Sequence, residues 1–165
     1  MREALFHCLQ NLLQFGEGRK QYDAADLLHK FGNERDALLY ALVFVPDFVE
    51  VEGSILHANF TLNRAAFPES FINKKLENRW PLWELERSFN YVETSHMFGT
   101  RNIREIEDKS DLLFAQFVAQ AWSGRLCFLY PTRRFVVSVI GPEDSGDAYA
   151  VSFYEERKES IGAIE

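Results

Sequence analysis

The spacing of apolar residues changes along this chain, and this change restricts the folds that are open to it. Up to about residue 45, apolar side chains recur every three or four positions, which is the spacing of one helix face. From 48 to 58 they alternate with charged residues, as in a strand with one buried face. Helical spacing returns at 110–123 and alternation at 134–154. The pattern predicts helices combined with antiparallel hairpins.

Helices are predicted over most of residues 3–45, at about 3–15, 23–31 and 33–45. The first carries an apolar stripe of Leu5, Cys8, Leu9, Leu12 and Phe15. Such a stripe is typical of a helix that forms one wall of a core, and the alternative is a docking helix for another chain. Asn33 is the predicted N-cap of the third helix, and Pro46 ends it, because a residue before proline disfavours helical backbone.

The strands come from two predicted hairpins, at about 48–58 and 134–154, whose turns contain glycine. The intervening segment 61–109 is irregular or helical, with a helix starting near Trp80, and the long helix at 110–123 follows it. We expect a single α+β domain over residues 1–165. Its antiparallel sheet would have about four strands, with helices packed mainly on one face.

Two residue types bear on the core. Phenylalanine accounts for 15 of the 165 residues, and because the ring carries no polar atom, most of these side chains should be buried. The two cysteines, Cys8 and Cys127, lie in apolar segments and are too few for a disulfide framework. We predict that both are buried free thiols, as expected in a reducing cytosol.

The chain is acidic, with a formal net charge of -7 and a pI near 5.2. Nucleic-acid binding depends on Lys and Arg, and the basic pairs here are scattered, so we expect no nucleic-acid partner. An acidic surface instead steers basic partners. The N-terminus lacks the long apolar run of a signal peptide, and we expect no stretch to approach the roughly 18 apolar residues of a spanning helix. The expected location is cytoplasmic, without membrane contact.

No catalytic motif is recognisable. The glycines of residues 16–18 follow a helix rather than a strand, and neither the histidines nor the cysteines have the spacing of a zinc site. Asp47, Glu50 and Glu52 are arranged like the carboxylates of a magnesium-dependent nuclease, but the accompanying lysine is missing. We therefore predict no catalytic residue, no metal and no cofactor, and favour a binding role over an enzymatic one.

The first hypothesis is a non-enzymatic acidic binding protein whose contact surface consists of Trp80, Trp83, Glu84 and Glu86. Tryptophan is enriched among the residues that dominate binding energy, and carboxylates complement a cationic partner. An immunity-type inhibitor of a basic, nuclease-like toxin is the concrete form of this hypothesis. The competing interpretation is that both tryptophans belong to the core or its rim.

Two alternatives stay open. One is a small-ligand-binding protein or enzyme whose site is assembled from dispersed residues, namely His57, Asn59, Tyr91, His96 and Arg101. A concave pocket that holds these groups would favour it. The other is a subunit of a homo-oligomer that uses a Phe-rich surface, which would be visible as a large exposed apolar patch.

Overall fold

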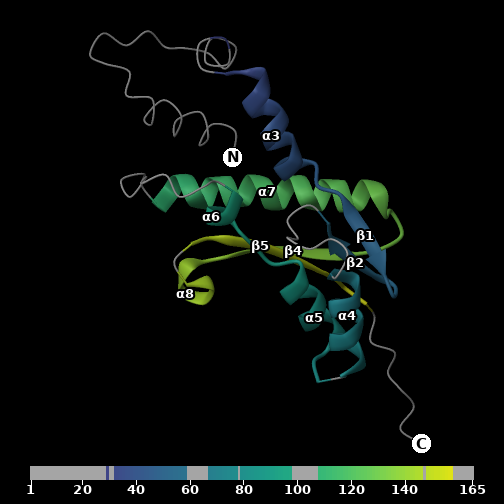
Figure 1. Ribbon diagram of the computed structural model, residues 1–165. Helices are drawn as coiled ribbons and strands as arrows, with labels where there is room; N and C mark the ends of the chain where they lie inside the picture. Colours follow the sequence, from purple (N-terminus) through teal and green to yellow (C-terminus); the bar gives the residue numbers. More distant parts are fainter. Residues whose placement is uncertain are drawn as a thin grey trace, which may run out of the picture.

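The computed structural model describes residue 29 and residues 32–58, 67–77, 79–97, 108–146 and 148–157. In chain order the elements are α3 (Glu34–Phe44), β1 (Phe48–Val51), β2 (Ser54–His57), α4 (Phe67–Leu76), α5 (Leu82–Phe89), β3 (Val92–Glu93), α6 (Thr94–Met97), α7 (Asp108–Leu129), β4 (Phe135–Ile140), α8 (Pro142–Ser145) and β5 (Ala150–Glu155) (Figure 1). The α+β class is confirmed. The helices predicted at 3–15 and 23–31 lie outside the described residues.

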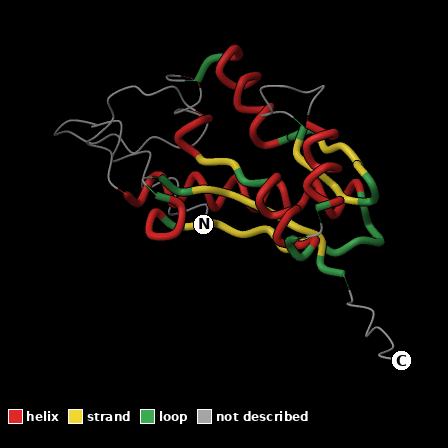
Figure 2. The backbone as a smooth tube through the Cα atoms, turned by 60° about the horizontal axis from the view of Figure 1, so that its bottom comes forward, coloured by secondary structure: helices red, strands yellow, loops and turns green. Residues whose placement is uncertain are grey.

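The described strands form two antiparallel sheets. β1 pairs with β2 around a turn at Glu52 and Gly53, both with positive φ, as a two-residue hairpin turn requires. In the second sheet β5 lies between β3 and β4, and the two longest strands run side by side (Figure 2). Both pairs, β1–β2 and β4–β5, fall where hairpins are predicted, but a single sheet of about four strands is not confirmed.

Helices cover both faces of β5, which corrects the expectation that they pack mainly on one face. Val151 and Phe153 point toward α7 and join its apolar cluster. Ser152, which alternation places on the other face, donates a hydrogen bond to the Arg87 carbonyl of α5 at 2.6 Å. Figure 1 shows α7 and α5 on opposite sides of this strand. Burial on both faces explains why β5 lacks strict polar alternation.

The hairpin of β1 and β2 lies between two apolar clusters. Ile55 joins the cluster centred on Trp122 and Leu126 of α7. Its neighbour Leu56 joins a second cluster, which contains Phe71 of α4 and Leu85 of α5. Successive residues of one strand therefore connect the two halves of the core.

Helix α7 runs to Leu129; the sequence left open whether it ends at Gly124 or runs a little past it, and the structure shows that it runs past. The helix continues because Leu126, two residues beyond the glycine, is fully buried in the core. Residues Asp111–Leu129 are long and apolar enough to cross a membrane by length and composition, so the expectation that no such stretch exists is wrong. The core-facing stripe of this helix is fully buried and consists of Ala115, Val118, Trp122 and Leu126.

Cys127 is exposed, so its prediction as a buried thiol is wrong. It follows Leu126 on α7, and one residue turns the side chain by about 100° away from the core stripe. An apolar sequence context did not reveal this, because α7 is apolar on more than its buried face. Cys8 lies outside the described residues.

Candidate functional site

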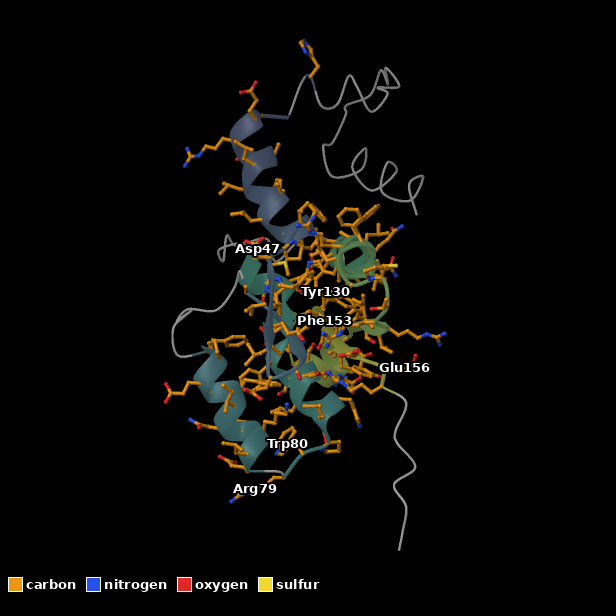
Figure 3. The ribbon with its side chains drawn as sticks, turned by 90° about the vertical axis from the view of Figure 1, so that its right-hand side faces the viewer. Asp47, Arg79, Trp80, Tyr130, Phe153 and Glu156 are labelled. Carbon is orange, nitrogen blue, oxygen red and sulfur yellow. The ribbon has the colours of Figure 1, made fainter. Side chains whose placement is uncertain are left out.

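Three large apolar side chains are exposed where α4 and α5 meet. Leu76 ends α4, Trp80 lies in the connection, and Trp83 is in the first turn of α5; they are 77%, 54% and 41% exposed, respectively. We call these three residues the tryptophan surface. Figure 3 shows Trp80 beside Arg79 at one end of the molecule, far from Phe153 in the core.

The positions of α4 and α5 are fixed by ring packing beneath this surface. Phe89 of α5 lies with its ring centroid 5.1 Å from that of Phe71 and 5.4 Å from that of Phe67, both on α4. On the β5 side, the Trp83 ring lies 5.5 Å from Tyr154. Trp83 thus lies at the edge of α5 with its ring toward Tyr154, and 41% of its surface is exposed.

The structure separates Glu84 from Glu86. Two positions on a helix are about 200° apart, so these side chains point to opposite sides of α5. Glu84 is half-buried at the surface, whereas Glu86 is fully buried. The sequence-based hypothesis placed Glu86 on an exposed acidic contact surface. Because Glu86 is buried, it does not contribute to such a surface.

Glu86 belongs to a network of ion pairs. One of its carboxylate oxygens lies 2.7 Å from Nη2 of Arg157, and the other accepts a hydrogen bond from the Glu155 backbone N–H at 3.0 Å. The Arg157 nitrogen also lies 2.7 Å from the Glu155 carboxylate. A buried charge is tolerable only with such partners, so the role of Glu86 is to join α5 to the end of β5.

Arg133 extends this network to the first hairpin. It forms an ion pair with Glu155 through two nitrogens, and a longer one of 3.3 Å with Glu50 of β1. The hydrogen bond with Glu155 raises the pKa of Arg133. The Gly53 carbonyl, in the β1–β2 turn, accepts hydrogen bonds from both Arg133 and Arg157. Two arginines thus hold the turn of one sheet against the end of the other.

Asn90, directly after α5, bridges the two sheets. Its amide oxygen accepts a hydrogen bond from the His57 backbone N–H at 2.8 Å, and its amide nitrogen donates to the Ile55 carbonyl at 3.0 Å. The same nitrogen donates to the Phe153 carbonyl of β5 at 3.2 Å. This buried side chain supplies hydrogen bonds that a neighbouring strand would otherwise make.

The dispersed ligand-site residues are placed only in part. His57 is buried with its ring 4.6 Å from that of Trp122, and burial lowers the pKa of His57 to about 4. Tyr91 precedes β3, and its pKa is raised by partial burial and then by nearby Glu93. Asn59 and Arg101 lie outside the described residues; His96 is in α6, and its side chain is not described. His57 therefore packs in the core, as a structural residue does.

Among the residues that the structure describes, no group of three or more His, Cys, Asp and Glu side chains is placed to hold a metal ion. Asp47, Glu50 and Glu52 do not form such a group, and Glu50 instead contacts Arg133.

Sequence reasoning missed the polar network around Glu86 and Asn90. A signal was present: Leu82, Leu85 and Phe89 mark the inner face of α5, and Glu86 and Asn90 fall on the same side of the helix. Polar residues at core positions of a helix indicate buried hydrogen bonding. Their partners, Arg133 and Arg157, come from distant segments and carry no local pattern.

Comparison of the chain with protein-family models, with curated proteins and with solved structures finds no significant match.

Proposed function

We propose that this chain is a non-enzymatic protein that binds another protein through the tryptophan surface. The observation that carries the proposal is the exposure of Leu76, Trp80 and Trp83 at one end of the fold. Exposed aromatic and aliphatic side chains that gather at one place are typical of interaction sites. Tryptophan in particular concentrates binding energy when a partner covers it.

The polar side chains that link the elements support a binding role over an enzymatic one. Glu86, Arg133 and Arg157 bond to one another or to main-chain groups, and Asn90 bridges strands. Groups with these partners hold the fold together. Their arrangement fits a rigid scaffold that presents a contact surface.

The partner we propose is a basic protein of the cytosol. The net charge of -7 attracts cationic proteins over long distances and speeds their capture. Next to Leu76 the charges are mixed, since Lys74 forms an ion pair with Glu77 at 3.9 Å. Acidity would therefore accelerate the encounter, and the apolar side chains would hold the complex. An immunity-type inhibitor of a basic, nuclease-like toxin combines both features.

The test is a pull-down from native lysate with three forms of the protein: wild type, Trp80→Ala with Trp83→Ala, and Phe128→Ala. Phe128 is a matched control because it is a large exposed ring on another element, α7. We expect one stoichiometric basic partner on the wild type and on Phe128→Ala, and its loss from the double variant. Both variants should keep the wild-type circular dichroism.

Retention of the same partner by the folded double variant would remove the tryptophan surface from the proposal. Loss of the partner from Phe128→Ala alone would move the contact to α7.

A further inference from the structure

Strand β4 forms an edge of the three-stranded sheet. In that sheet β5 lies between β3 and β4, so among the described strands β4 is paired along one side only. Figure 2 shows β4 at the outer margin of the sheet. The opposite edge strand, β3, is two residues long, whereas β4 has six. A long edge strand presents a row of backbone groups with which another strand can pair.

The register of β4 and β5 shows which backbone groups face the open edge. The Glu156 N–H donates a hydrogen bond to the Arg134 carbonyl at 2.8 Å, so these two residues form a hydrogen-bonded pair of the ladder. Hydrogen-bonded and non-hydrogen-bonded pairs alternate along an antiparallel ladder. The backbone N–H and C=O groups of Phe135, Val137 and Val139 therefore point away from β5. No strand that the structure describes pairs with them.

The sequence of β4 has none of the features that usually prevent edge pairing. Its residues, FVVSVI, include no proline and no charged residue, and all except the serine are β-branched or aromatic. Charges lie instead at the two ends of the strand. Arg134, directly before β4, is exposed, and so are Glu143 and Asp144 of α8, which begins just after β4. One end of the open edge is therefore basic and the other acidic.

We propose that β4 pairs in antiparallel orientation with β4 of a second copy of this chain, across a two-fold axis at Val137. In this register Val137 lies opposite Val137 of the second copy, and Phe135 lies opposite Val139. All the residues whose backbone groups face the edge then form hydrogen-bonded pairs, each of which exchanges two bonds. The sheets of the two copies become continuous. Because the contact uses the same edge of both copies, the assembly closes as a dimer.

The charges at the ends of β4 favour a second copy as the occupant of the edge. The antiparallel register places Arg134 opposite Ile140 of the other copy, next to the start of its α8. The Glu143 carboxylate lies beside Gly141 at that same end. Each Arg134 is thus brought near Glu143 and Asp144 of the other copy, and the two-fold axis makes the contact occur twice. A parallel copy would instead place like charges opposite each other, which is unfavourable.

Sedimentation velocity of the full chain over a range of concentrations tests the proposal, and we expect a reversible monomer–dimer equilibrium. Arg134→Glu should raise the dimer dissociation constant about tenfold, because two exposed attractive contacts become repulsive. The charge-swapped variant, Arg134→Glu with Glu143→Lys and Asp144→Lys, should return to within about twofold of wild type. Arg35→Glu, the same change of charge at an exposed position of α3, is the control and should leave the dissociation constant unchanged.

Val137→Pro tests the backbone contact. Proline removes an N–H that points at the edge and leaves the hydrogen bonds to β5 in place. The dissociation constant should rise on the order of 30-fold, because each copy loses a central donor. Circular dichroism verifies that this variant is folded; if it is not, the charge variants decide the question alone, since their positions are exposed.

A wild-type chain that stays monomeric at every concentration would overturn the proposal. A dimer that neither Arg134→Glu nor Val137→Pro weakens would overturn it as well, because the contact would then lie elsewhere. Failure of the charge-swapped variant to recover the dimer would overturn the antiparallel arrangement.

Discussion

At the scale of single residues, Asn90 and His57 show how the interior of this fold handles polarity. Asn90 uses both ends of its amide on three main-chain groups of two different sheets. His57 presents its backbone N–H to that amide and its ring to Trp122. Asn90 bridges the sheets by hydrogen bonds, and the His57 ring packs against Trp122. Both buried side chains thus contribute to stability.

Asn90→Ala should lower the free energy of unfolding by about 3 kcal/mol, because it leaves buried main-chain groups of β2 and β5 without a partner. Urea denaturation followed by fluorescence measures the change. Asn73→Ala, at an exposed position of α4, is the control and should stay within about 0.5 kcal/mol of wild type. Equal stability of the two variants would contradict the bridging role.

Stability should also fall as the pH decreases from about 6.5 toward 4. The pKa of His57 is lowered from 6.5 to about 4 in the folded chain, so the unfolded chain takes up the proton first. The contribution of His57 to the free energy of unfolding is fully present above the unfolded-state pKa of 6.5. By pH 5 about 2 kcal/mol of it is lost, because the unfolded chain binds the proton and the folded chain does not.

His57→Gln removes that contribution while keeping the backbone bond to Asn90. Comparison of urea curves at pH 7 and pH 5 should show a loss in wild type that exceeds the loss in the variant by about 2 kcal/mol. An identical pH dependence of the two proteins would show that His57 is not the group responsible.

At the scale of elements, α5 carries two different surfaces on eight residues. Its inner side holds Leu85 and Glu86, and its outer side presents Trp83 and Glu84. The sequence predicted the apolar residues of the inner side correctly as one face. It did not predict that a carboxylate belongs there, because its partner Arg157 follows β5, 71 residues later.

Lysine substitutions distinguish the two sides of α5. Glu86→Lys places a buried positive charge beside Arg157 and removes the acceptor of the Glu155 N–H, which should cost about 3–5 kcal/mol. Glu84→Lys should change stability by less than about 1 kcal/mol, because the side chain is half-buried at the surface. Thermal denaturation of both variants measures the difference. Similar melting temperatures would contradict the assignment of Glu86 to the interior.

At the scale of the whole molecule, local pattern predicted the hairpins and the class but not their assembly. Alternation and turn glycines placed β1–β2 and β4–β5 correctly, since both signals are local. The arrangement of the two sheets against each other involves Asn90 and Arg133, which make contacts across long stretches of sequence. The sequence likewise did not decide whether Trp80 is exposed, since tryptophan occurs in both cores and interfaces.

The most direct test uses the partner that the pull-down identifies. Its binding to wild type and to Trp80→Ala with Trp83→Ala would be measured by surface plasmon resonance at two salt concentrations. We predict that the double variant dissociates at least 100-fold faster, since two central tryptophans are lost, while its association rate changes little. Higher salt should slow association of both proteins, because the net charge of -7 steers the encounter. A double variant that is folded and binds within twofold of the wild-type Kd would contradict the central claim that the tryptophan surface holds the partner.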